Sequence, residues 1–273
     1  MRTQAEKGQA FRALHERKRA FILPNPWDPG TARLLERLGF EALATTSAGY
    51  AFSLGRLDNT VDRHAVMAHL VEIASATDLP VSADLGKGFG DALEIVAETI
   101  RLAADAGVVG GSIEDATGRP EDPIYSQKLA VERVRAAAEA ARALPFPFTL
   151  TARAENFLVG RIDLKDTIER LQAYQEAGAD VLYAPGLVNR GDIAAVVSAV
   201  DRPVNVLMGS PGVRLNLELL SEIGVRRVSV GSALSRVAYG AFLRAAREMQ
   251  EHGTFTFAEE AVSYHDISSL IKA

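Results

Sequence analysis

The sequence predicts a (β/α)8 barrel, the closed α/β fold in which eight parallel strands alternate with helices. Short apolar runs rich in β-branched residues recur along the 273 residues and end in polar or glycine-rich turns, as buried strands of a parallel sheet do. Longer stretches follow them, with apolar residues at intervals of three and four. There are eight strand-like runs, and few residues lie outside the repeating pattern of strand and helix. This favours a barrel over a doubly wound sheet.

The expected elements follow one another in a regular order. Strands are predicted at 21–25, 41–46, 81–85, 110–115, 148–153, 181–186, 204–208 and 227–232. Between them, helices are predicted most clearly over 91–107, 126–144 and 163–178. Gly107 and Gly178 stand where C-terminal helix caps fall, since glycine tolerates the left-handed backbone needed there.

The two ends of the sequence predict additional helices. Residues 1–20 predict an N-terminal helix, and residues 255–273 predict an amphipathic helical tail that packs on its own barrel or on a neighbouring subunit. No linker or shift in composition divides the chain, so residues 1–273 are expected to form a single barrel domain.

Composition limits the classes of function. With 30 basic and 35 acidic residues the net charge is −5 and no basic patch stands out, so a nucleic-acid partner is not expected. No apolar run reaches membrane-spanning length, and the N-terminal stretch lacks the apolar centre of a secretory signal, so a cytoplasmic protein is expected. The absence of cysteine excludes disulfides, thiolate metal ligands and a cysteine nucleophile.

Acidic residues end two adjacent predicted strands. Asp84 ends one apolar run, and Glu114 and Asp115 end the next. In this fold the active site forms at the C-terminal ends of the strands, where converging carboxylates repel each other unless a cation or a proton intervenes. An oxygen-only set of ligands suits Mg²⁺ or Mn²⁺. Arg153 ends the following strand and can bind a substrate carboxylate in a bidentate pair. Together they predict a site for a small anionic oxo acid whose enolate is held by a metal.

Each of these residues also has a plain structural interpretation. A single acid at a strand end is often a helix N-cap or a solvated loop residue, which is what we expect of Asp91 and Asp163. Arg153 alone would be a salt-bridge partner. The combination on adjacent strands is what favours a functional site. Substrate contacts are further expected from other strand ends, namely Trp27, Asp28, Ser47, Ala48, Gly49 and Asn205, although Trp27 is also expected to be partly core.

The stretch VSADLGKGFGD (81–91) raises the alternatives of a phosphate loop and a dinucleotide loop. The spacing of Gly86, Gly88 and Gly90 fits neither G-x-x-x-x-G-K-[ST] nor G-x-G-x-x-G. We therefore interpret it as a connection in which Asp84 is the chemical group and the glycines permit close approach of the backbone to a ligand.

Several motifs together resemble the isocitrate lyase/phosphoenolpyruvate mutase superfamily, which includes 2-methylisocitrate lyase and oxaloacetate decarboxylase-like proteins. The resemblance covers about residues 20–250 and depends on NPWDPGTAR (25–33), TTSAG (45–49), DLGKGFG (84–90), SIED (112–115), TARAENF (151–157) and QAYQEAGAD (172–180). It implies a (β/α)8 barrel, bound Mg²⁺, and the making or breaking of C–C or P–C bonds next to an enolpyruvate-like fragment. Family members commonly swap the last helix between subunits, so the resemblance also implies a homo-oligomer, a dimer or a tetramer, and a role for residues 255–273.

The resemblance also implies roles for single residues. Asp84 matches the main metal-binding acid, and Glu114 matches the acid that holds metal-bound water. Arg153 matches the arginine that grips the substrate carboxylate, and Asp58 matches an acid of the gating segment. The loop that binds the oxo-acid oxygens corresponds to Ser47, Ala48 and Gly49.

The sequence departs from the family pattern in three places. Gly86 replaces a second acid of the third loop and Lys87 follows it, and a lysine beside the metal acids is expected to weaken divalent binding or to substitute its own charge. Residues 116–127 lack the K-K-C-G-H segment that supplies the catalytic cysteine of the lyases. The sixth strand ends in residues 184–186, APG, where the lyases have a glutamate.

The predicted function is that of a Mg²⁺-dependent lyase or decarboxylase. It would cleave a C–C bond of a small 2-oxo or 2-hydroxy carboxylic acid through an enolate, with water or Tyr125 as the proton donor in place of a cysteine. Two alternatives remain open: an enzyme of phosphonate P–C bonds, and a barrel that binds an oxo acid without turning it over.

Overall fold

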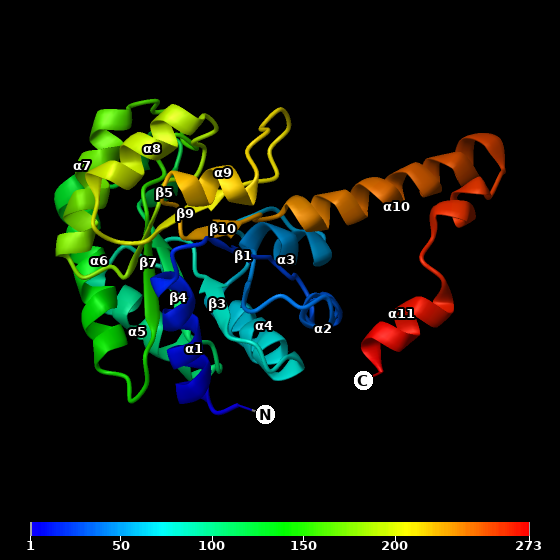
Figure 1. Cartoon of the computed structure of the whole chain (residues 1–273), viewed down its shortest axis with the longest axis horizontal. Coiled ribbons are helices and arrows are strands. Elements are labelled where there is room, and N and C mark those ends of the chain that lie inside the picture. Colours follow the sequence, from blue (N-terminus) through cyan, green and yellow to red (C-terminus); the bar gives the residue numbers. More distant parts are fainter. Residues whose placement is uncertain (1, 273) are drawn as a thin grey trace.

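The computed structural model describes residues 2–272 and confirms the barrel (Figure 1). Eight parallel strands form one sheet in the order β1-β10-β9-β8-β7-β4-β3-β2. Its two edge strands meet where the backbone N–H of Ala44 donates to the carbonyl of Pro24 at 3.1 Å, so the sheet nearly closes. All eight predicted strands are present, as β1 (Phe21–Leu23), β2 (Leu43–Ala44), β3 (Val81–Asp84), β4 (Gly110–Glu114), β7 (Thr149–Arg153), β8 (Val181–Tyr183), β9 (Val204–Leu207) and β10 (Arg227–Ser229).

Helices follow the strands and cover the outside of the barrel (Figure 1). The three most clearly predicted helices are present, and two of them end two residues before the left-handed Gly107 and Gly178, as the cap positions predict. The helices are α1 (Gln4–Glu16), α2 (Pro29–Arg37), α3 (Ser47–Ser53), α4 (Arg63–Ala76), α5 (Leu93–Asp105), α6 (Gln127–Arg142), α7 (Leu164–Glu176), α8 (Arg190–Ala199), α9 (Leu217–Glu222), α10 (Ala233–His252) and α11 (Tyr264–Ile271), with a 3₁₀ turn η1 (Thr256–Glu260) before α11.

The predicted N-terminal helix is α1, and its apolar face packs on the barrel. Phe11 and Leu14 are buried in one cluster with Phe21, Leu23 and Val109, residues at or near β1 and β4. Burying these side chains against the strands ties α1 to the barrel through the hydrophobic effect.

A hairpin that the sequence did not predict lies between β4 and α6. Strands β5 (Ala116–Arg119) and β6 (Asp122–Ile124) pair antiparallel over the segment that follows the SIED motif. Both strands are short and lack the alternation of apolar and polar residues that marks a strand in sequence.

Helix α10 leaves the barrel instead of packing on it (Figure 1). Of its 20 residues only Ser235 is buried. The predicted tail is formed by η1 and α11, and α11 returns to lie against α2. In the part of the chain that the structure describes, no helix is both long and apolar enough to cross a membrane.

Candidate active site

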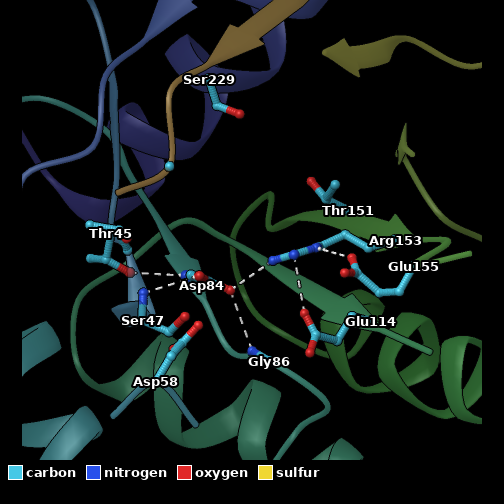
Figure 2. A network of polar contacts seen from close by, with 12 residues as sticks. Thr45, Ser47, Asp58, Asp84, Gly86, Glu114, Thr151, Arg153, Glu155 and Ser229 are labelled. Atoms are coloured by element: carbon cyan, nitrogen blue, oxygen red, sulfur yellow. Dashed lines mark hydrogen bonds and ion pairs between the residues drawn. The ribbon is translucent and has the colours of Figure 1, made fainter. Parts of the chain in front are cut away.

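The predicted acids and arginine meet at the C-terminal ends of three neighbouring strands (Figure 2). Asp84 ends β3, Glu114 ends β4, and Arg153 ends β7, where it is paired in register with Glu114. The Arg153 guanidinium lies 3.1 Å from Asp84 Oδ1 through Nη1 and 3.2 Å from Glu114 Oε2 through Nη2. Its Nε donates to Glu155 Oε1 at 2.8 Å. One buried cation therefore faces three carboxylates.

This cluster carries more negative charge than Arg153 neutralises. Burial raises the pKa of Glu114 to about 8, although the charge of Arg153 opposes that shift. Burial likewise raises the pKa of Glu155. Burial lowers the pKa of Arg153, but Glu155, Glu114 and Asp84 outweigh it, so the pKa stays well above its ordinary value. A further cation or a proton at Glu114 would relieve the surplus of charge.

Asp84 is held in place by the loop after β2. Its Oδ2 accepts from the backbone N–H of Ser47 at 3.1 Å, and its own N–H donates to Thr45 Oγ1 at 2.9 Å. Its Oδ1 also accepts from the N–H of Gly86 at 3.4 Å. These bonds join the ends of β2 and β3, so the TTSAG motif positions the principal carboxylate of the site.

Asp58 reaches the same cluster from the loop between α3 and α4 (Figure 2). The loop is exposed, but the carboxyl end of Asp58 is turned toward Ser47 and Asp84. Partial burial and the nearby charge of Asp84 raise the pKa of Asp58. Hydrogen bonds from Ser47 and from the backbone of Asn59 oppose this rise.

A cavity of about 160 Å³ opens between these groups, and we call it the mouth cavity. It brings together most of the predicted substrate contacts, and hydroxyl groups of β3, β4 and β10 line its deeper part. The predicted residues that line it are Ser47, Ala48, Asp58, Asp84, Arg153 and Asn205. Glu114 adjoins it through its ion pair with Arg153.

Trp27, Asp28 and Gly49 do not line this cavity and have structural contacts instead. Asp28 caps α2, accepting from the N–H of Thr31 at 2.7 Å. The N–H of Gly49 donates to Thr46 Oγ1 at 3.2 Å inside α3. A Cβ on Gly49 would lie 3.2 Å from the Cβ of Trp27, so the two residues are packed closely under the loop.

Tyr125 also lies apart from the acid cluster. Its hydroxyl donates to Asp91, and the guanidinium of Arg133 stands 4.4 Å from the centre of its ring. It lines a different cavity, together with Arg161 and Arg170. Tyr125 therefore does not line the mouth cavity.

The structure corrects the expected position of one acid, Asp115. Asp115 points away from Asp84 because neighbouring strand residues face opposite sides, and it forms a buried ion pair with Arg170 at 3.1 Å. Asp91 is not an N-cap, since α5 begins after Ala92 without a side-chain cap, but it is an exposed loop residue, which is the other role expected of it. Asp163 caps α7 as predicted.

Among the described residues, Lys87 forms no ion pair with Asp84 or Glu114, the acids beside which the sequence analysis placed it. Its Nζ donates to the carbonyl of Thr117 at 2.8 Å and pairs with Asp91 at 3.1 Å. The flanking Gly86 and Gly88 have φ of +52° and +80°, a left-handed backbone that turns Lys87 toward the β5–β6 hairpin.

The sequence interpretation missed a buried arginine that lines the mouth cavity. Arg227 begins β10 and is 4% exposed, and it donates to Asn205 Oδ1 and Thr151 Oγ1, both at 2.9 Å. Its Nη1 lies 3.4 Å from His15 Nε2. Among residues 2–272 no carboxylate forms an ion pair with it, and burial lowers its pKa to about 10. The only sequence signal was a charged residue at the start of an apolar run.

The donor set of the site suits a hard divalent cation. Within residues 2–272, no three His, Cys, Asp or Glu side chains are grouped as ligands of one ion. Mg²⁺ does not need such a group, because it often binds one or two carboxylates and completes its shell with water and substrate. Asp84 and Glu114 supply two carboxylates where negative charge is in excess, so these residues fit Mg²⁺ or Mn²⁺.

Comparison with known proteins gives consistent matches over most of the chain. The family model described as phosphoenolpyruvate phosphomutase matches residues 11–250. The probable 2-methylisocitrate lyase 1 of Corynebacterium glutamicum is 31% identical over 90% of this chain and 82% of its own length. The oxaloacetate decarboxylase of Pseudomonas paraeruginosa is 32% identical over 86% of this chain and 81% of its own.

The solved structures agree in fold. A crystal structure from Burkholderia cenocepacia J2315 is 64% identical, covers 99% of this chain and 97% of its own, and superposes with a TM-score of 0.97. The barrel, including its C-terminal helices, is therefore shared with an experimentally determined protein.

Proposed function

The chain belongs to the phosphoenolpyruvate mutase/isocitrate lyase superfamily, and on this premise we propose that it is a Mg²⁺-dependent carbon–carbon lyase of a small 2-oxo or 2-hydroxy carboxylic acid. The observation that carries the proposal is the position of Arg153, which lies between Asp84 and Glu114 on the wall of the mouth cavity. A carboxylate-binding cation and a pair of metal-binding carboxylates thus lie within contact of each other.

Arg153 is suited to hold the substrate carboxylate. A guanidinium has five N–H donors, and three contacts here go to Asp84, Glu114 and Glu155. Two N–H groups remain for a ligand in the mouth cavity. The three fixed contacts hold the guanidinium plane rigid, and this orients the bound carboxylate before reaction.

The cleavage step requires stabilisation of an enolate and movement of a proton. A divalent cation at Asp84 and Glu114, when bound, would stabilise the negative charge on the enolate oxygen. Ser47 lines the same cavity, and its hydroxyl donates to Asp58 there. Asp58, whose pKa is raised, is the side chain best placed to take the proton of a substrate hydroxyl or to return one to the enolate carbon.

The proposal is tested by thermal melting with Mg²⁺ and oxalate, singly and together. Oxalate imitates the planar enolate of a 2-oxo acid, and a ligand present at about 100 times its Kd stabilises the native state by about 2.7 kcal/mol. We expect a joint rise of the melting midpoint in the wild type and none in Asp84→Ala. Asp105→Ala is the matched control, since Asp105 is an exposed acid at the end of α5, which precedes β4, whereas the site lies at the other end of β4.

Product analysis then identifies the bond that is cleaved. We expect the protein to release a 2-oxo acid from hydroxy or oxo dicarboxylic acids, and NMR detects this product. Turnover of phosphonopyruvate with no turnover of these acids would overturn the carbon–carbon assignment, and no joint shift with Mg²⁺ and oxalate would overturn the metal–enolate site itself.

A further inference from the structure

A second cavity adjoins the acid cluster, and Asp84 and Glu114, the proposed metal-binding pair, form only one part of its lining. Its volume is about 430 Å³, larger than the mouth cavity, and it extends between α3, α4 and the β5–β6 hairpin. Both cavities are lined by Thr45, Thr46, Ser47 and Asp84. They therefore open onto the same carboxylate from two sides, and we call the larger one the side cavity.

The side cavity differs from the mouth cavity in chemistry. The mouth cavity is lined by two arginines and several hydroxyl and amide groups. The side cavity also has charged residues in its lining, namely Asp84, Lys87, Glu114 and Arg119, but in addition it has an apolar and aromatic wall, formed by Tyr50, Val61, Val66, Leu85 and Phe89. A wall of this kind favours a hydrocarbon group over a charged one.

Gly86 contributes no side chain next to Asp84, the carboxylate that the two cavities share. Gly86 lines the side cavity directly after Asp84, and a Cβ built on it meets only Asn59 Oδ1, at 3.5 Å. Lys87 is turned toward Thr117 and Asp91. A group attached to a ligand at Asp84 therefore has an open path into the side cavity.

His69 supplies one unsatisfied polar group in this apolar wall. It is 4% exposed, and its ring stacks on Tyr50 with centroids 3.7 Å apart and planes 6° from parallel. Among the described residues its Nε2 has no hydrogen-bond partner. An unpaired buried polar atom costs free energy, so this nitrogen indicates a partner that is not part of the protein.

We propose that the side cavity binds a side chain of the substrate, namely an apolar chain that leaves the reacting end at Asp84 and carries a hydrogen-bonding group for His69. This inference rests on the proposed function, because the reacting end must be held by Arg153 and Asp84. It assigns the substrate to the longer-chain 2-oxo or 2-hydroxy acids instead of the two- to four-carbon acids that would fill the mouth cavity alone.

Binding of a graded series of ligands tests the inference in the full-length protein with Mg²⁺. The series is pyruvate, 2-oxobutanoate and 2-oxohexanoate, with oxalate as the probe of the reacting end, all by titration calorimetry. The affinity is expected to rise about fourfold for each methylene, which is the effect of removing a CH₂ group from water. A hydroxyl at the end of the six-carbon chain is expected to raise the affinity further.

Two variants separate the side cavity from the reacting end. Val66→Trp fills the cavity and should abolish the dependence on chain length while leaving oxalate affinity unchanged. His69→Phe keeps the stacked ring and should abolish only the gain from the terminal hydroxyl. Val71→Trp is the matched control, because Val71 lies on the same helix α4 and is 49% exposed. If Val66→Trp fails to fold, Val61→Phe on the preceding loop replaces it.

The outcomes distinguish this inference from the function on which it depends. Equal affinity for pyruvate and 2-oxohexanoate, with oxalate binding intact, would overturn the side-cavity assignment and leave the proposed function standing. A dependence on chain length that survives both cavity-filling variants would also overturn it. Failure of oxalate and of all 2-oxo acids to bind would overturn both.

Discussion

The raised pKa of Glu114 should make the free energy of unfolding depend on pH. Glu114 is 11% exposed at its side chain, and burial raises its pKa to about 8 from an ordinary value of 4.5. Without metal, the folded state then binds more protons than the unfolded state between these two values. The stability due to this group is fully present below pH 4.5 and is lost as the pH rises through about 8.

Glu114→Gln should remove this part of the pH dependence. In metal-free buffer, we expect the free energy of unfolding of the wild type to fall by about 2–4 kcal/mol more than that of the variant between pH 5 and 8. Urea titrations at several pH values measure the difference. Glu139→Gln, at an exposed position of α6, is the control, and parallel pH profiles for wild type and Glu114→Gln would contradict the prediction.

Single residues were predictable where the strand end alone decides the position. Asp84, Glu114 and Arg153 end neighbouring strands and face the same mouth, so the pattern of strands was enough to bring them together. Lys87 and Asp115 were not predictable in this way. The direction of Lys87 depends on left-handed glycines, and that of Asp115 depends on which side of β4 it faces.

Helices and strands were predicted most accurately where a whole segment of the chain is buried. The strands of the barrel are short runs buried on both sides, and such runs are visible in sequence. Helix α3 and strands β5 and β6 were not predicted, because each is short and makes its decisive contacts with residues distant in sequence. The loops that shape the two cavities fall in this class.

Gly8 provides a test of how closely α1 packs on the barrel. A helical Gly→Ala change ordinarily stabilises a protein by about 0.5–1 kcal/mol. At Gly8, however, the added Cβ would lie 2.3 Å from the carbonyl oxygen of Pro147, which is backbone and cannot move aside easily. We therefore expect Gly8→Ala to destabilise the protein by about 1–3 kcal/mol.

The control for Gly8 is Gly191, an exposed glycine in the first turn of α8. There the nearest atom to an added Cβ is Asn189 Oδ1 at 3.5 Å, an ordinary contact. Gly191→Ala should leave the stability unchanged or raise it slightly in urea denaturation. A Gly8→Ala protein as stable as the wild type would show that α1 shifts freely on the barrel.

At the scale of the whole molecule, the outstanding feature is the exposed helix α10. Phe242 is 66% exposed and Met249 is 42% exposed, and their spacing of seven residues places them on one face of the helix. Exposed apolar faces of this kind mark interaction surfaces, and most of the stability of a helix in a protein comes from packing such a face against a partner. We propose that α10 packs against a second copy of the chain, consistent with the helix exchange that the sequence resemblance implies.

Phe242→Asp combined with Met249→Asp should therefore dissociate the oligomer. Placing two carboxylates in a buried apolar contact imposes a desolvation cost that the contact cannot offset. Sedimentation velocity is expected to show an oligomer for the wild type and a monomer with a lower melting midpoint for the double variant. Leu38→Asp, which changes a side chain that is also 66% exposed but follows α2, should sediment as the wild type does. A wild-type protein that is monomeric at micromolar concentration would refute the proposal, and the exposed face of α10 would then require another partner.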